Sequence, residues 1–274
     1  MVEIEIHSFC NRKCSWCPNS FIDRTHKTEL NGAMYLNLLN QLDDENFRGA
    51  ISYSRYNEPL ADIDLLCRRI EQARDWLPDC KIVTNTNGDY LNPATLYALD
   101  VDELTIMDYD NRGVQWCWDR LEDLGATPLY IDDSKNFIAA EYFDMQIRYD
   151  FDWQKNALIE DRGNSLKGDF NWKNGKCDRD YACHEPKYFI GIDYDGSVTP
   201  CCHIRETTVT IAGWCLAISL RSHWQTSIIL VWHGQYVKPP LREHSLHPVR
   251  RAIRTVADIL KTMQEFFHEV CCRH

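Results

Sequence analysis

The chain has 274 residues and a formal net charge of -11, with 44% hydrophobic and 26% charged residues, as in an ordinary soluble globular protein. The acidic balance argues against a broad nucleic-acid-binding face, because binding phosphates needs clustered cations. No stretch is apolar enough for a membrane span and the N-terminus lacks the regions of a signal peptide, so we expect a cytoplasmic protein without membrane or nucleic-acid partners.

Strands and helices are predicted to alternate over the first 150 residues. Val2, Ile4 and Ile6 alternate with polar residues, which predicts a first strand. Further strands are predicted at 50–54, 81–85, 103–107, 128–131 and 145–148, with helices near 30–43, 63–77, 93–99 and 114–124 between them. The alternation implies parallel βαβ units and therefore an α/β fold, a partial (β/α)6 TIM-like barrel with its functional residues at the carboxyl ends of the strands.

The chain is predicted to have three parts. Residues 1–155 form the partial barrel, 156–205 a linker and a small cysteine-rich domain, and 206–274 a C-terminal tail. Residues 1–205 carry 36 acidic and 22 Lys and Arg residues, whereas the tail carries 5 and 8. This break in composition predicts that the tail is atypical of related chains, and its role stays open.

Thirteen cysteines are many for such a chain, and they are unevenly distributed. An odd number without a secretion signal favours reduced thiols or metal ligands over disulfides. Three lie within residues 10–17 and four within 177–202, which indicates two ligand clusters. Cys67, Cys80 and Cys117 fall on predicted apolar helix faces or at the start of a strand, so we expect them in the core.

The first group, Cys10, Cys14 and Cys17, has C-x3-C-x2-C spacing directly after the first strand. Thiolates are the ligands of iron–sulfur clusters, and three of them can hold three irons of a cubane while leaving the fourth open. A zinc site completed by a distant Cys or His is the alternative.

This spacing, with Trp16 before the last cysteine, resembles the defining motif of the radical S-adenosylmethionine (SAM) superfamily. The resemblance implies a [4Fe–4S] cluster that binds SAM at its open iron, with Trp16 near the cofactor. It further implies reductive cleavage of SAM to a 5′-deoxyadenosyl radical, abstraction of hydrogen from a substrate C–H bond, and a reductant such as flavodoxin or ferredoxin.

Tyr56, Asn57, Glu58 and Pro59 follow the second strand, where the superfamily usually has a Gly-Gly-Glu-Pro-like segment. The resemblance implies that the backbone of this segment and Glu58 hold the SAM amino group. Tyr56 and Asn57 replace the glycines, which is compatible with contacts made mainly by the backbone. The alternative is that Glu58 is an acid at a helix N-terminus, favoured by the dipole.

Two further SAM contacts are implied at other strand ends. Thr84 and Asn85 match the end of the third strand in the superfamily, where hydroxyl and amide groups meet the ribose; a simple turn is the alternative. Arg148, at the end of the sixth predicted strand, is a candidate for the SAM carboxylate, and an ordinary surface arginine is the alternative.

In the second group, twelve residues separate Cys183 from Gly196, and four separate Gly196 from Cys201. The residues between the cysteines predict a β-hairpin that turns at Asp195-Gly196. The spacing resembles the opening of SPASM and twitch domains, which implies an auxiliary [4Fe–4S] cluster ligated by Cys183 and Cys201, with Cys177 six residues before Cys183 as a further candidate ligand. The later cysteines of a full SPASM domain are missing, which favours the twitch form.

Other features of this group stay open. The fourth ligand could be Cys177, Cys202, or Cys215 and Cys271 of the tail, and a zinc-stapled hairpin is the alternative to a cluster. His184 and His203 flank the cysteines as candidate hydrogen-bond donors.

Cysteines beyond those needed as ligands favour an epimerase, because epimerisation needs a thiol that returns hydrogen to the opposite face. Cys202 is the candidate hydrogen donor, and a sugar-like (aminoglycoside) or peptide natural product is the expected substrate. A radical SAM dehydrogenase or a peptide cross-linking maturase is the alternative. A zinc-binding interaction protein without catalysis is the rival from another class.

Overall fold

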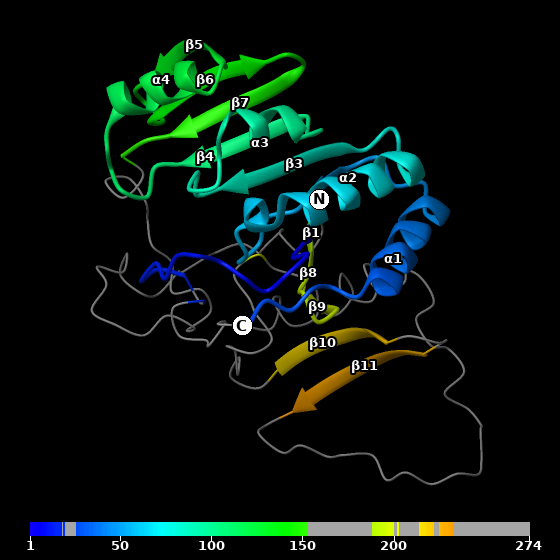
Figure 1. Cartoon of the computed structure of the whole chain (residues 1–274). Helices are drawn as coiled ribbons and strands as arrows, with labels where there is room; N and C mark the ends of the chain where they lie inside the picture. Colours follow the sequence, from blue (N-terminus) through cyan, green and yellow to red (C-terminus); the bar gives the residue numbers. More distant parts are fainter. Residues whose placement is uncertain are drawn as a thin grey trace, which may run out of the picture.

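The computed structural model describes residues 1–17, 19, 26–152, 188–199, 202, 214–221 and 225–232, the last two segments by their backbone alone. They form one mixed sheet of eleven strands with helices packed on it (Figure 1). The strands are β1 (Val2–Ile4), β2 (Ala50–Ser52), β3 (Lys81–Thr86), β4 (Glu103–Met107), β5 (Thr127–Asp132), β6 (Phe137–Tyr142), β7 (Met145–Asp150), β8 (Ile190–Ile192), β9 (Ser197–Thr199), β10 (Trp214–Arg221) and β11 (Gln225–Trp232). The helices are α1 (Gly32–Asp44), the 3-10 helix η2 (Pro59–Asp62), α2 (Ile63–Trp76), α3 (Pro93–Ala98) and α4 (Val114–Asp123).

The sheet has the order β11-β10-β9-β8-β1-β2-β3-β4-β7-β6-β5. From β8 to β7 each strand is parallel to its neighbour, and both ends of the sheet are antiparallel. Since β1 to β4 lie side by side in chain order and such crossovers are right-handed, their connecting helices lie on one face. The carboxyl ends of these strands therefore meet along one edge of the sheet.

The predicted alternation holds through α4 and then fails. After α4 the chain forms β5 and β6 as an antiparallel pair before β7 returns beside β4. The prediction missed β6, because its two alanines have low strand propensity and blur the period-two pattern. The end strands β5 and β11 lie at opposite ends of the sheet (Figure 1), so the described strands form an open sheet and not a closed barrel.

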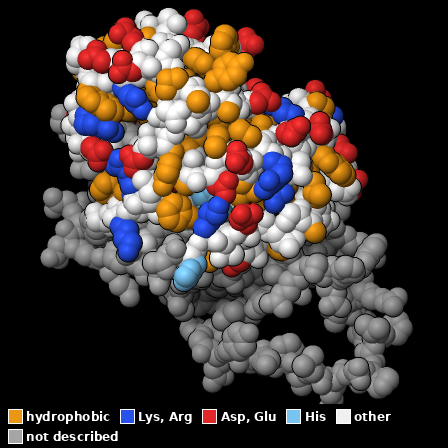
Figure 2. Space-filling model, in the orientation of Figure 1, with side chains coloured by type: hydrophobic (Ala, Val, Ile, Leu, Met, Phe, Trp, Pro, Cys, Tyr) orange, Lys and Arg blue, Asp and Glu red, His pale blue; other side chains and the backbone are white. Residues whose placement is uncertain are grey.

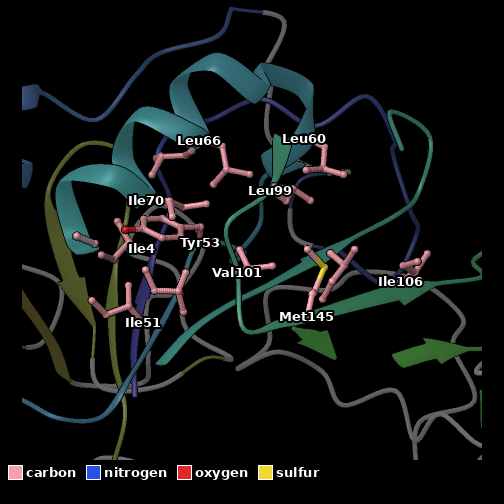
Figure 3. Close-up of a cluster of buried hydrophobic side chains, with 14 of the residues drawn as sticks. Ile4, Ile51, Tyr53, Leu60, Leu66, Ile70, Leu99, Val101, Ile106 and Met145 are labelled. Atoms are coloured by element: carbon pink, nitrogen blue, oxygen red, sulfur yellow. The ribbon is translucent and has the colours of Figure 1, made fainter. Parts of the chain in front are cut away.

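The core lies between the parallel strands and the helices. In Figure 3, Ile4 and Ile51 from the strands and Leu66 and Ile70 from α2 point toward one another across this layer. Of the three cysteines expected in the core, Cys80 and Cys117 are buried, but Cys67 is only half-buried and its thiol donates to the carbonyl of Ala98.

The predicted hairpin around Gly196 is present as β8 and β9. Gly196 has φ +85°, a conformation that side chains with a Cβ rarely adopt, which accounts for a glycine in this turn. The tail contributes β10 and β11, an antiparallel pair that the sequence analysis did not predict.

On the surface of the described residues, acidic and basic side chains are interspersed with apolar ones on the face seen in Figure 2. The helices in the described part of the chain are all too short or too polar to cross a bilayer.

Candidate functional site

The loop that carries the first three cysteines leaves the carboxyl end of β1. Cys10, Cys14 and Cys17 are each half-buried, and the N–H of Cys17 donates to the carbonyl of Cys14 over 2.9 Å. The three thiols therefore belong to one short loop between residues 10 and 17. Burial raises the pKa of Cys10 to about 12 and that of Cys14 to about 11. Thiols held this way ionise when a metal supplies positive charge.

The arrangement of these donors suits a cluster. Within the described segments, no three His, Cys, Asp or Glu side chains converge as ligands of a single metal ion do. A cubane takes one thiolate per iron, so its ligands stand apart. The chemistry of the donor set, three half-buried thiols on one loop, fits three irons of a [4Fe–4S] cluster.

Arg12, between the first two cysteines, fastens this loop to the ends of β3 and β4. Its Nε and Nη2 lie 2.7 and 2.5 Å from the two carboxylate oxygens of Asp89, and its Nη1 lies 2.9 Å from Asp110 Oδ1. Asn11 Nδ2 also donates to Asp89 over 2.6 Å, and Asn87 Nδ2 donates to Asn11 over 2.8 Å. The hydrogen bonds from Arg12 lower the pKa of Asp89 and of Asp110.

Glu58 connects the ends of three strands. Its carboxylate accepts from Thr86 Oγ1 at 2.6 Å, from the Asn87 N–H at 2.8 Å and from the Leu60 N–H at 3.1 Å. Its own N–H donates to the carbonyl of Phe9, one residue before Cys10, over 2.9 Å. Burial raises the pKa of Glu58 to about 7, against the effect of these hydrogen bonds. Glu58 thus caps η2, as the helix-start alternative expects, and its contact with SAM stays a prediction.

The rest of the Tyr56–Pro59 segment makes hydrogen bonds both to its neighbours and to distant parts of the chain. Asn57 Oδ1 accepts from the backbone N–H of Arg55 over 3.1 Å, and Pro59 is the first residue of η2. The hydroxyl of Tyr56 donates to the carbonyl of Cys202 over 2.7 Å, and the side-chain amide of Asn19 donates to the carbonyl of Tyr56. The segment is therefore held from both the cysteine loop and the β8–β9 side.

The other candidate residues lie in different surroundings. Trp16 packs against Tyr109, which follows β4, with ring centroids 5.7 Å apart. Thr84 is buried, and its hydroxyl has no hydrogen-bond partner among the described residues, whereas Asn85 is exposed. Arg148 contacts the strands β6 and β7: its Nε lies 2.6 Å from Asp150 Oδ1, and its guanidinium lies 4.3 Å from the ring centroid of Phe137. Their roles toward SAM stay predictions.

Most of the second cysteine group lies outside the described residues. This holds for Cys177, Cys183 and Cys201, and also for His184, His203 and Cys271. Cys202 is half-buried, and Cys215 belongs to β10.

Sequence reasoning missed the residues that hold the site together. Arg12, Asp89 and Asp110 were not singled out, although an arginine between two candidate ligands is a usable signal. Asp89 and Asp110 lie 77 and 98 residues after Arg12 in the chain, and no local sequence pattern predicts a contact over such separations.

Part of the chain is similar to a known enzyme. The chain is similar to the S-adenosyl-L-methionine-dependent 2-deoxy-scyllo-inosamine dehydrogenase of Niallia circulans, with 36% identity over 103 residues, 36% of this chain. The match spans only 39% of that protein's length. No family model matches the chain.

Among solved structures, the fold is similar to the crystal structure of BtrN in complex with AdoMet and 2-DOIA. The TM-score is 0.53 at 24% sequence identity, covering 74% of this chain and 73% of that one. A structure of SeMet BtrN in an open conformation gives a TM-score of 0.47 at 22% identity, over 74% of this chain and 69% of that one. The first of these two comparisons shows that the mixed α/β sheet is a fold similar to that of BtrN.

Proposed function

We propose that this chain is a radical SAM dehydrogenase that oxidises a secondary alcohol of a sugar-like aminocyclitol in natural-product biosynthesis. The observation that carries the enzyme class is the arrangement of the C-x3-C-x2-C loop, whose residue Phe9 is hydrogen-bonded to Glu58 and whose Arg12 is paired with Asp89. The similarity to a SAM-dependent 2-deoxy-scyllo-inosamine dehydrogenase favours the reaction and the substrate class.

The dehydrogenase replaces the epimerase that the sequence analysis favoured. The comparison supports the dehydrogenase alternative, and dehydrogenation needs no thiol that returns hydrogen to the substrate. Cys202 then loses its expected role as hydrogen donor. Oxidation of a CH–OH group to a ketone removes one hydrogen atom, one proton and one electron. The expected auxiliary cluster is a suitable one-electron acceptor, and its ligands stay a prediction.

In this proposal the chain's own residues hold and orient the cofactors. Cys10, Cys14 and Cys17 would ligate the cluster, and the backbone of Tyr56–Pro59 would bind the SAM amino group. When bound and reduced, these cofactors supply a 5′-deoxyadenosyl radical. Arg12 with its two carboxylates keeps the loop at the strand ends. Glu58 is buried, as suits a site that must keep water from a reactive species.

The test of the enzyme class is anaerobic reconstitution with iron and sulfide, followed by assay of 5′-deoxyadenosine in the presence of SAM and a reductant. Wild type should turn brown and form 5′-deoxyadenosine, and replacing Cys10, Cys14 and Cys17 together by Ala should abolish its formation. Cys67→Ala is the matched control, because that half-buried thiol donates to Ala98 away from the loop. A colourless wild type that binds one zinc would establish the rival interaction protein instead.

The reaction is tested with 2-deoxy-scyllo-inosamine in deuterated water. A dehydrogenase forms a ketone and about one 5′-deoxyadenosine per product. An epimerase would instead return an alcohol that carries solvent deuterium at the inverted carbon. That result would support the epimerase hypothesis, in which a spare cysteine donates the hydrogen.

The auxiliary cluster is tested separately. In the variant lacking Cys10, Cys14 and Cys17, the protein should retain about four irons per chain, the content of one cubane. Adding Cys183→Ala and Cys201→Ala should remove it, as measured by iron and sulfide analysis with Mössbauer spectroscopy. A triple variant that contains no iron would reject the auxiliary cluster.

A further inference from the structure

Arg55 stands between the end of β2 and Tyr56, and its side chain crosses the β8–β9 hairpin. The guanidinium is buried, with 1% of the side chain exposed, and forms a close ion pair with Asp193. Its Nη1 lies 3.2 Å from Glu3 Oε2 on β1, and its Nη2 lies 2.7 Å from Thr199 Oγ1 on β9. Burial opposes the charge of Arg55, but the carboxylates of Asp193 and Glu3 outweigh it and raise its pKa. One side chain thus joins β1, the end of β2 and the hairpin.

The hairpin leaves room for this arginine at Gly191. A Cβ on Gly191 would lie 2.7 Å from Cζ of Arg55 and 2.9 Å from Thr199 Oγ1, closer than real Cβ atoms come to other atoms. Gly191 pairs with Glu3 on one side and Thr199 on the other, so the guanidinium lies over the middle of the three strands. The glycine and the arginine therefore form one packing unit.

Arg55 also contacts the two residues that precede Glu58. Its backbone N–H donates to Asn57 Oδ1, and its guanidinium lies 5.1 Å from the ring centroid of Tyr56. Tyr56 in turn donates to the carbonyl of Cys202, just beyond the hairpin. Arg55 therefore contacts the hairpin directly, and Tyr56 contacts Cys202 just beyond it. Asn57 is linked to the hairpin through its hydrogen bond with Arg55.

We propose that Arg55 is a positioning residue for SAM: by clamping the β8–β9 hairpin to the end of β2, it fixes the backbone of Tyr56–Pro59 that would bind the SAM amino group. This inference rests on the proposed function. A buried ion pair adds little stability over packed apolar residues, so a stabilising role alone accounts poorly for a fully buried guanidinium with two carboxylate partners. The orientation it imposes on the next residues accounts for it better.

The experiment compares Arg55→Met with the double variant Arg55→Met/Asp193→Asn, in reconstituted protein. The double variant avoids leaving the buried Asp193 carboxylate without its ion-pair partner, so its melting temperature should stay closer to that of wild type. Both variants should bind SAM about tenfold more weakly in equilibrium dialysis, because a displaced segment no longer presents its backbone groups. Without SAM, amide hydrogen exchange over 53–60 should be faster in both, with exchange over 103–107 unchanged.

Arg74→Met is the matched control. Arg74 also pairs with two carboxylates, but it does so at the opposite ends of the strands, with Asp102 Oδ1 at 3.1 Å and Asp100 Oδ2 at 3.4 Å. It should lower the melting temperature without weakening SAM binding. The inference would be overturned if the Arg55 variants kept wild-type SAM affinity and wild-type amide hydrogen exchange over 53–60. It would also be overturned if Arg74→Met lost as much SAM affinity as they do. A wild type that binds no SAM would overturn the proposed function, and this inference with it.

Discussion

The pair formed by Arg12 and Asp89 should contribute measurably to the stability of the cysteine loop. Two N–H groups of Arg12 meet the two oxygens of Asp89, and the side chains are only 18% and 31% exposed. Charge-assisted hydrogen bonds contribute about 1.5–3 kcal/mol when protected, and exposed ion pairs about 0–1 kcal/mol. For this partly exposed pair we expect a coupling of about 1–2 kcal/mol.

The assay is a double-mutant cycle of Arg12→Gln and Asp89→Asn, followed by urea unfolding under anaerobic, reducing conditions. Asp110→Asn is the comparison, since Asp110 is 49% exposed and should couple to Arg12 by about 0.5 kcal/mol. The Asp89 variant should also lose iron faster to a chelator than the Asp110 variant. A coupling between Arg12 and Asp89 below about 0.3 kcal/mol, the usual limit of additivity, would refute the reasoning.

The same pair predicts a pH dependence. Because Arg12 lowers the pKa of Asp89 in the folded protein, Asp89 stabilises the fold above its ordinary pKa, and this stabilisation is lost as pH falls through the lowered folded value. The coupling should therefore be constant between about pH 5 and 8 and decline below about pH 4. A coupling that weakens instead between pH 6 and 8 would assign it to another group.

Three further substitutions have clear expectations. Gly88→Ala should lower the unfolding free energy by about 1–2 kcal/mol, because φ is +79° and the new Cβ would lie 3.2 Å from Ile106 Cγ2; near-wild-type urea stability would contradict this. Tyr53→Phe should cost about 1–2 kcal/mol, since its hydroxyl lies 2.6 Å from that of Tyr35 in the core; an unchanged midpoint would show that this hydrogen bond is worth nothing net. Glu58→Gln should weaken SAM binding roughly ten- to a hundredfold if the carboxylate contacts the amino group; wild-type affinity with reduced stability would leave Glu58 its role as the cap of η2 alone.

The elements that could be predicted are those whose pattern is local. Helix α1 begins after Asn31, whose side chain accepts from the N–H groups of Ala33 and Met34, and its buried residues follow the expected spacing. The turn at Gly196 was visible for the same reason, since a left-handed conformation selects glycine. Strand β6 was missed because its two alanines have low strand propensity, and its pairing with β7 is not visible in the local sequence.

The residues of the candidate site could likewise be predicted only where their signal is local. The cysteine spacing is such a local signal, and it identified the loop. Glu58 and Arg55 each have a partner far away in the sequence: Thr86 is 28 residues from Glu58, and Asp193 is 138 residues from Arg55. The helix-start role of Glu58 could be inferred as an alternative because the helix dipole favours an acid at a helix N-terminus. The hairpin clamp could not be inferred, because nothing near Arg55 in the sequence indicates that Gly191 leaves it space.

The place of β1 has a consequence for folding during synthesis. This strand pairs on one side with β2 and on the other with β8, whose residues Ile190–Ile192 come almost two hundred positions later. At about 5–20 residues per second, a ribosome needs about 10–40 s to make the intervening chain. During that interval the β1 edge that later receives β8 has no partner, and an unpaired strand edge can pair with another chain. Expression at lower temperature, or in the presence of chaperones that cover such edges, should therefore raise the soluble yield.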